Sequence, residues 1–211
     1  IEQYKKIGKI LDVGCGNGGF LSAFSSNINW EAYGIEQNPA GYVLSKQKMQ
    51  DNIFNKELLE CKFADTYFDI ITMLHVFEHI CEPNDLLQEI NRILDGHGIL
   101  IIGIPNIKSV GFRIGKQNWF HLDAPRHFCH YDRSTIKKIL NNNGFSVLRI
   151  LYPFAEYPLD LYHSIINSLQ KNKFVKIPLI LPLLIISLVL KPVFSLLKIS
   201  ETMIVICKKG I

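Results

Sequence analysis

The sequence predicts an α/β fold, with a doubly wound, mostly parallel sheet covered by helices. Short apolar runs alternate with segments of helical periodicity along the 211 residues, as expected for strands joined by crossover helices. The runs Lys9–Val13, Phe68–Leu74 and Gly98–Ile104 are apolar on both faces, which is typical of strands buried on both sides. Neither a repeat nor a low-complexity linker divides the chain, so we expect a single domain over residues 1–211.

Local signals predict the remaining elements. Ala32–Ile35, Phe145–Leu151 and Thr202–Cys207 have the length and composition of strands. Apolar residues recur at helical spacing from Pro83 to about Asp95, and proline is tolerated in the first helical turn. The other expected helices are Gly18–Ser26, Pro39 to about Gln50, and a helix that Asp132 or Ser134 caps and that ends at Asn143-Gly144.

An apolar helical insertion is expected between the last two strands, at residues 152–200. Within it, Ile177–Leu190 reads IPLILPLLIISLVL and carries no charge. This run is shorter than the ~20 residues of a spanning helix, and a single crossing of a bilayer would separate two strands of one sheet. Prolines 178, 182 and 192 predict short helical pieces. We expect a lid that contacts lipid at a membrane surface, or a second copy in a homodimer, through residues 174–198; core packing is the alternative.

Composition disfavours some classes of partner and indicates the cellular compartment. The net charge of +4 is mildly basic, without the basic and aromatic track of a nucleic-acid-binding protein. The five cysteines are odd in number and include no C-x-x-C pair, which disfavours disulfides and a cysteine zinc site. We expect no nucleic-acid partner and a cytoplasmic location, peripheral at the membrane if the insertion contacts lipid. The pattern of a signal peptide does not precede the first strand.

The segment ILDVGCGNGGF, residues 10–20, contains Gly14-x-Gly16-x-x-Gly19, the glycine spacing of a dinucleotide-binding loop. Glu36 ends the second expected strand, where a carboxylate can bind ribose hydroxyls. Asp12 ends the first strand, and its carboxylate is poorly matched to a pyrophosphate. It suits a ligand with ammonium and sulfonium charge, which favours S-adenosylmethionine over a nicotinamide dinucleotide. A plain tight turn with Asp12 as its cap is the structural alternative.

Four segments together carry a family resemblance. LDVGCGNGG, YGIE, FADTYFDIITMLHVFEH and LDGHGILIIGIPN resemble, in order and spacing, the class I S-adenosylmethionine-dependent methyltransferases. The resemblance covers residues 7–151 and the closing ETMIVICKK, and implies a Rossmann-like sheet of seven strands with an antiparallel C-terminal strand. The segment HLDAPRHFCHYDRSTIKKILNNNGF is similar to a subgroup of bacterial small-molecule methyltransferases related to the ubiquinone-pathway O-methyltransferases.

The resemblance also implies roles for particular residues, with S-adenosylmethionine as the cofactor. The glycine turn would line its methionine part, with Asp12 near the ammonium group, and the acid after the second strand would hold the ribose. The segment IFNKELLE departs from the G-D pair of many relatives, so the adenine contact is the least specific match. The implied cofactor-binding residues are Asp12, Gly14, Cys15, Gly16, Gly19, Glu36, Gln37, Glu57, Leu58, Leu74 and His75.

Histidines supply the candidate catalytic groups. His75-Val-Phe-Glu78-His79 also matches the inverted zinc-protease pattern H-x-x-E-H, but that pattern needs a long helix and here it follows a strand directly. We therefore expect no metal; Glu78 is expected to hydrogen-bond backbone around the pocket, and His79 either to support it or to act in catalysis. In Asp123-Ala-Pro-Arg126-His127, an Asp–Arg pair would order the loop, so that His127 either acts as general base or packs beneath it.

These observations favour an enzyme that transfers a methyl group from S-adenosylmethionine to a small-molecule or lipid-linked acceptor, at oxygen. Two alternatives stay open. An NAD(P)-dependent oxidoreductase would share the glycine loop, and a non-catalytic protein of the same fold would use its apolar insertion for membrane or subunit contact.

Overall fold

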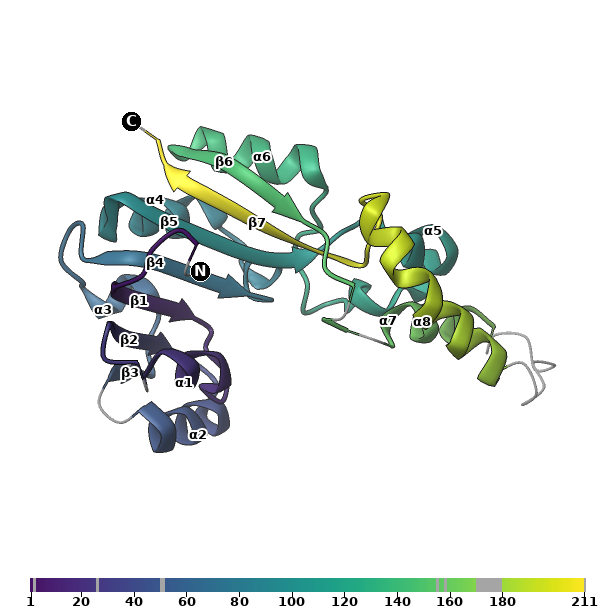
Figure 1. Cartoon of the computed structure of the whole chain (residues 1–211), viewed down its shortest axis with the longest axis horizontal. Coiled ribbons are helices and arrows are strands. Elements are labelled where there is room, and N and C mark those ends of the chain that lie inside the picture. The colour runs from purple at the N-terminus through teal and green to yellow at the C-terminus, as the bar shows by residue number, and fades with distance from the viewer. Residues whose placement is uncertain are drawn as a thin grey trace.

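Seven strands form one sheet in the order β3-β2-β1-β4-β5-β7-β6 (Figure 1). The computed structural model describes residues 1, 3–25, 27–49, 52–154, 156, 157, 159–169 and 180–210. β7 runs antiparallel to β5 and β6, and the other neighbouring pairs are parallel. The expected mostly parallel sheet with an antiparallel C-terminal strand is thus confirmed. The strands are β1 (Gly8–Val13), β2 (Trp30–Ile35), β3 (Ile53–Phe54), β4 (Phe68–Leu74), β5 (Leu94–Pro105), β6 (Phe145–Leu151) and β7 (Thr202–Lys209).

Helices connect the strands, and the four helices that the sequence predicts outside the insertion begin and end within two residues of the expected bounds. Asp132 caps α6, because its carboxylate accepts hydrogen bonds from the amides of Ser134 and Thr135 at 2.9 and 2.8 Å. Gly144, at φ +79°, follows the end of that helix. The helices are α1 (Gly19–Ser25), α2 (Pro39–Met49), α3 (Leu58–Cys61), α4 (Pro83–Ile93), α5 (Val110–Gly115), α6 (Arg133–Asn142), α7 (Asp160–Leu169) and α8 (Ile180–Leu196), with 3₁₀ turns η2 (Phe77–His79), η3 (Lys116–Asn118) and η4 (Phe120–Leu122).

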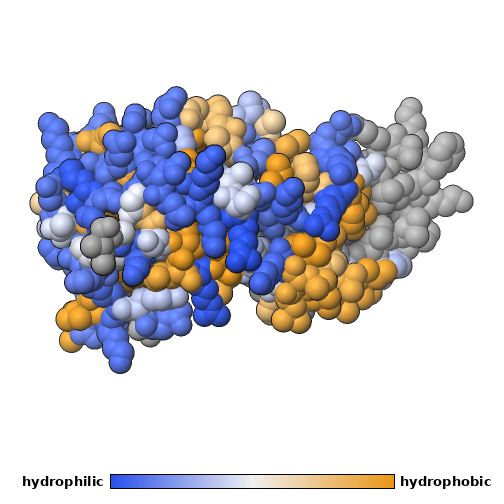
Figure 2. All heavy atoms as spheres, turned by 90° about the horizontal axis from the view of Figure 1, so that it is seen from above, coloured by the Kyte–Doolittle hydropathy of each residue, from blue (hydrophilic) through white to orange (hydrophobic). Residues whose placement is uncertain are grey.

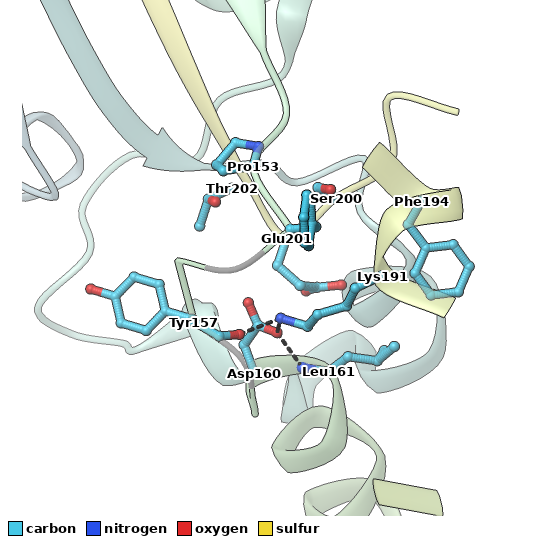
Figure 3. A pocket seen from close by; sticks show the side chains of 10 residues that line it. Pro153, Tyr157, Asp160, Leu161, Lys191, Phe194, Ser200, Glu201 and Thr202 are labelled. Atoms are coloured by element: carbon cyan, nitrogen blue, oxygen red, sulfur yellow. Dashed lines mark hydrogen bonds and ion pairs between the residues drawn. The ribbon is translucent and has the colours of Figure 1, made fainter. Parts of the chain in front are cut away.

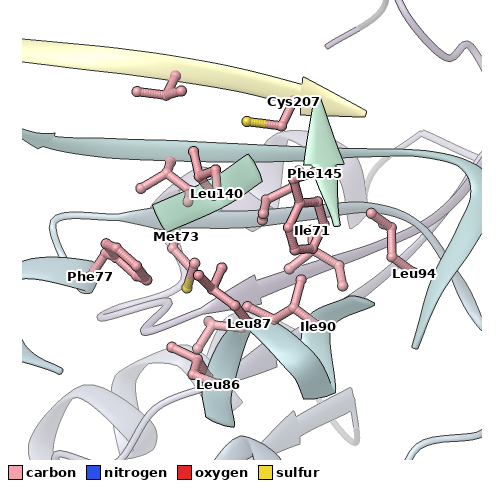
Figure 4. Close-up of a cluster of buried hydrophobic side chains, with 14 of the residues drawn as sticks. Ile71, Met73, Phe77, Leu86, Leu87, Ile90, Leu94, Leu140, Phe145 and Cys207 are labelled. Atoms are coloured by element: carbon pink, nitrogen blue, oxygen red, sulfur yellow. The ribbon is translucent and has the colours of Figure 1, made fainter. Parts of the chain in front are cut away.

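Two hydrophobic clusters pack on the opposite faces of the sheet. Leu11 and Ile71 belong to one cluster and their neighbours Ile10 and Ile70 to the other, because successive side chains of a strand point to opposite faces. Helices α4 and α6 cover the first face, where Leu87, like its neighbours in the cluster, is buried (Figure 4). Burial on both faces is the reason that these strands read as continuous apolar runs.

The insertion, residues 152–200, holds α7 and α8. The expected short pieces are wrong for the described part of the apolar run, because α8 is one helix. Pro182 lies in its first turn, where an amide needs no partner within the helix, and the helix continues through Pro192. Residues 170–179, which include Pro178, lie outside the described residues. Of the helices in the described ranges, none has both the length and the apolarity that crossing a membrane would require.

A buried ion pair joins α8 to α7 (Figure 3). The Nζ atom of Lys191 lies 2.5 Å from Oδ1 of Asp160 and also donates a hydrogen bond to the carbonyl of Tyr157. Both charged side chains are buried, at 9% and 2% exposure. Glu201 lies beside this pair and accepts hydrogen bonds from the indole of Trp119 and the amide of Gly111 at 2.7 and 2.6 Å. The cavity here measures only about 10 Å³, so it is a packed polar junction rather than a ligand site.

Candidate functional site

A cleft of about 690 Å³ opens at the carboxyl ends of β1, β2 and β4. In α/β sheets, ligands bind at this edge, where the strand order reverses. Here β1 has β2 on one side and β4 on the other, so the strand order reverses beside β1. Of the residues expected in the site, Gly14, Glu36, Gln37, Glu57, Leu58, His75 and His79 line the cleft.

The turn between β1 and α1 has left-handed backbone at three glycines. Gly14, Gly16 and Gly18 have φ of +77°, +56° and +72°, which favours glycine at each position. A Cβ added to Gly16 would meet nothing within 4 Å, so a ligand can approach the backbone there. Gly19 begins α1, and its amide donates to Oδ1 of Asn17 at 2.9 Å. The left-handed conformation therefore lies at Gly18 rather than at Gly19 of the sequence motif.

Glu36 is held against this turn. Its carboxylate accepts hydrogen bonds from the amides of Gly16 and Asn38, both at 2.7 Å, and its carbonyl accepts one from Asn55 at 2.6 Å. Each carboxylate oxygen keeps a further lone pair. The acid after β2 is therefore fixed in place at the wall of the cleft, with acceptor capacity for hydroxyl groups.

Two expected site residues lie behind the turn rather than on the surface of the cleft. Asp12 is 3% exposed, and Thr72 of β4 donates to its Oδ1 at 2.6 Å. Burial raises the pKa of Asp12 to about 7, although the hydrogen bond from Thr72 opposes this and the charge of Glu36 adds to it. No cation among the described residues pairs with Asp12. Cys15 is buried in the core, which raises the pKa of its thiol to about 12, so it faces the turn through its backbone alone.

The side of the cleft where the resemblance implies the adenine contact is built from α3. Glu57 caps this short helix through a capping box with Glu60, and Leu58 is 3% exposed beneath it. Both line the cleft, beside Gln37. Leu74 ends β4 and packs toward Gly103, and it is not among the residues that line the cleft.

His75 lies between two carboxylates. Its Nε2 is 3.1 Å from Oε1 of Glu156, and its Nδ1 is 3.4 Å from Oε1 of Glu78. Burial alone would lower the pKa of His75, but its interactions with Glu156 and Glu78 raise it to about 9, so the ring is cationic at neutral pH. The H-x-x-E-H segment spans a strand end and the three-residue η2, which is not the long helix of a zinc protease.

Glu78, His79 and His127 form a second polar cluster at the edge of the cleft. Glu78 is 1% exposed, and neither of its carboxylate oxygens has a hydrogen-bond partner among the described residues. The expectation that this side chain bonds backbone is therefore wrong; its carbonyl instead accepts from the amides of Phe128 and Cys129, at 2.9 and 3.2 Å. One potential ligand atom of each of the three clustered residues lies within 4.8 Å of the others, so they are the described groups best placed to hold a metal.

The imidazole rings of His79 and His127, called the imidazole pair below, are each held by a contact between Nδ1 and a backbone carbonyl. His79 Nδ1 lies 2.9 Å from the carbonyl of Arg126, and His127 Nδ1 lies 2.8 Å from the carbonyl of His121. Each ring therefore donates from Nδ1 and keeps a lone pair on Nε2. The ring centroids are 4.6 Å apart. Burial lowers the pKa of His127, which keeps the ring neutral and able to accept a proton.

The loop that carries His127 is ordered as expected. Arg126 Nη2 donates to Oδ1 of Asp123 at 2.7 Å, and the Oδ2 atom of Asp123 lies 3.8 Å from Nε2 of His127. His121 is 5% exposed, and its Nε2 lies 3.4 Å from Asp160 of α7. This histidine therefore connects the loop to the insertion.

A sheet of this order, with a glycine turn after β1 and a fixed carboxylate after β2, defines a nucleoside-binding α/β domain. Residues 3–150 match the family model described as a methyltransferase domain. The chain belongs to this family, as a member of the class I S-adenosylmethionine-dependent methyltransferases that the resemblance of its motifs implied.

Curated relatives match about half of the chain. The ubiquinone biosynthesis O-methyltransferase of Glaesserella parasuis is 30% identical over 108 residues, which are 46% of this chain and 45% of that protein. The chloroplastic tocopherol O-methyltransferase of Arabidopsis thaliana is 29% identical over 108 residues, 48% of this chain and 31% of that protein. The match thus spans less than half of the length of either relative.

Solved structures share the fold. A SAM-dependent methyltransferase from Archaeoglobus fulgidus superposes with a TM-score of 0.66 at 21% identity, over 98% of this chain and 88% of that one. Phosphoethanolamine N-methyltransferase 2 of Haemonchus contortus, solved with S-adenosyl-L-methionine, gives 0.63 at 15% identity, over 97% of this chain and 49% of that one. At such identities the similarity shows the fold alone.

Proposed function

We propose that this chain transfers a methyl group from S-adenosylmethionine to a hydroxyl oxygen of a small or lipid-linked acceptor. The observation that carries the proposal is that Gly14 of the glycine turn, Glu36 and His79 line one cleft, with the ring of His127 against that of His79. The names of the relatives, which are O-methyltransferases of ubiquinone biosynthesis and of tocopherol, support oxygen as the acceptor atom.

The residues present fit the cofactor. The cleft has the volume of a small-molecule site, and the open face of Gly16 admits close approach to the backbone. Asp12 is a buried carboxyl group without a cationic partner among the described residues, and an ammonium group beside it would supply that charge. Glu36 would accept hydrogen bonds from ribose hydroxyls, while Glu57 and Leu58 would contact the adenine.

When bound, S-adenosylmethionine supplies a methyl group on a positively charged sulfur, which is a good leaving group. The chain has to hold the acceptor oxygen in line with that methyl group, and such positioning contributes on the order of 7–11 kcal/mol in favourable cases. The Nε2 atoms of the imidazole pair are the available proton acceptors. His79 lines the cleft, and we assign it to the acceptor hydroxyl, with His127 behind it. Glu78 and Asp123 then stabilise the imidazolium that forms.

The test is methyl transfer from isotopically labelled S-adenosylmethionine to a matched acceptor panel. The panel holds a phenol with an isoprenoid chain, the same phenol without the chain, and the corresponding aniline. We expect label on the phenols and none on the aniline. Transfer to the aniline alone would contradict the assignment of oxygen. Tight binding of S-adenosylmethionine with no transfer across a broad panel would favour the non-catalytic alternative.

A further inference from the structure

A second hollow lies outside the cleft. A groove of about 460 Å³ runs between α5, α6 and the residues that follow α8. It lies at the same edge of the sheet as the cleft, because Lys108 follows the carboxyl end of β5 and Tyr152 that of β6. We call it the basic groove, since five of its lining residues are Lys108, Arg113, Arg133, Lys137 and Lys198.

The cations of the basic groove have no hydrogen-bond or ion-pair partners among the described residues. None of the five side chains makes an ion pair or a hydrogen bond within the part of the chain that the structure describes, whereas Lys5, for example, pairs with Asp69 at 3.0 Å. The acid in the groove, Asp132, is occupied because its carboxylate accepts from the amides of Ser134 and Thr135. Unpaired like charges around one hollow repel each other, and an anion with several oxygens, such as a phosphate group, would neutralise them.

An exposed apolar surface adjoins the basic groove. Side chains of α8 are largely uncovered, with Val189 at 67%, Leu196 at 81% and, just beyond the helix, Leu197 at 62% exposure. Lys198 of the groove is the next residue. Figure 2 shows a patch of hydrophobic surface at the α8 end of the molecule, bordered by hydrophilic residues. Residues 161–200 contain five lysines and neither aspartate nor glutamate.

The positive charge of the basic groove distinguishes between two possible partners of this surface, a second copy of the chain and a membrane. A second copy meeting α8 through its own α8 would bring two basic grooves together, and like charges oppose that contact. A bilayer with anionic lipids offers the complement of both features, since its acyl boundary accepts apolar side chains and its headgroups are negative. We propose that the basic groove binds phosphate-bearing headgroups of an anionic membrane, with α8 lying in the interface beside it.

Docking in this way places the carboxyl edge of the sheet, and so the opening of the cleft, toward the membrane. A lipid-dissolved acceptor would then reach the cleft without crossing water. The docking itself does not depend on methyl transfer, so the two proposals are tested separately.

The experiment is cosedimentation of the full chain with vesicles of phosphatidylcholine alone, or of equal parts phosphatidylcholine and phosphatidylglycerol. We expect binding to the anionic vesicles only, weakened by salt because the charges are exposed. The double variant Arg133→Gln/Lys137→Gln should bind about 30-fold more weakly, at about fivefold per cation removed. The control Lys48→Gln/Lys138→Gln removes two exposed lysines outside the groove and should bind within about fivefold of the unmodified chain.

Further measurements distinguish binding to lipid headgroups from binding to other anions and from nonspecific hydrophobic adsorption. Val189→Ser/Leu196→Ser, which alters exposed residues alone, should also weaken vesicle binding. Affinity of all variants for S-adenosylmethionine should be unchanged, which reports an intact fold. Equal binding to both vesicle types, or equal loss in the control and groove variants, would overturn the proposal. So would tight binding of inorganic phosphate or of single-stranded RNA that depends on Arg133 and Lys137 without vesicle binding.

Discussion

Asp12 offers the sharpest test of the cofactor site, because its carboxyl group is buried before any ligand arrives. A pKa of about 7, against 3.8 for an ordinary aspartate, means that half of the groups are protonated at neutral pH. If only the carboxylate pairs with the ammonium group of the cofactor, affinity should fall by about tenfold from pH 8 to pH 6, since the ionised fraction falls by that factor.

Asp12→Asn removes this titration while keeping the hydrogen bond from Thr72. At pH 8 the variant should bind S-adenosylmethionine about 10- to 100-fold more weakly, the equivalent of about 1.5–3 kcal/mol for a charge-assisted hydrogen bond. Toward pH 6 the two affinities should converge. Isothermal titration calorimetry at both pH values measures this, and the variant corrects for titration of the cofactor itself. Identical pH profiles for both proteins would refute the role of Asp12.

Ionisation of the same carboxyl group should favour cofactor binding but lower the stability of the fold. The folded pKa lies above the unfolded one, so the contribution of Asp12 to stability is lost as pH rises from about 4 through 7, by about 4 kcal/mol in all. Without cofactor, Asp12→Asn should therefore be the more stable protein at pH 8, by up to about 4 kcal/mol in urea unfolding, with a gap that closes on acidification. A less stable variant at pH 8 would show that the carboxylate is already neutralised.

The remaining predictions concern the imidazole pair and the insertion. His79→Gln and His127→Asn should each lower kcat by about 10²–10⁴-fold with cofactor affinity unchanged, and kcat unaltered in both would exclude general-base catalysis by the pair. Exhaustive dialysis against EDTA should leave kcat unchanged, whereas a loss restored by a divalent cation would assign Glu78 and the pair to a metal. Lys191→Met should destabilise the fold by about 3–5 kcal/mol, because the buried Asp160 loses its ammonium partner. Adding Asp160→Asn should recover most of this in chemical unfolding, and no recovery would mean that the ion pair is not the cause.

Features that depend on a single stretch of chain were predictable from the sequence. The strands buried on both faces, a cap at Asp132 or Ser134 and a glycine turn after the first strand each follow from residue type and spacing, and the structure selects Asp132 as the cap. β3 was missed because its two residues are too few for a periodic signal. The proline rule failed at α8, since Pro182 lies in the first turn, where proline is tolerated, and the helix also continues through Pro192.

Features that depend on strand pairing could not be read from the sequence. Thr72 meets Asp12 because the register of β1 and β4 aligns them, and no local pattern carries that information. Glu156 reaches His75 across a chain separation of 81 residues. The lack of a hydrogen-bond partner for the Glu78 carboxylate among the described residues was likewise invisible, although its place between two histidines in H-V-F-E-H marked it as a residue to examine.

The identity of the ligand in the cleft is central to the proposed function. Calorimetric titration of the purified chain with S-adenosylhomocysteine and, separately, with NADH decides it directly. We predict saturable binding of S-adenosylhomocysteine at one site and none of NADH. Tight binding of NADH by a protein that does not bind S-adenosylhomocysteine would contradict the assignment of the glycine turn, Asp12 and Glu36 to S-adenosylmethionine.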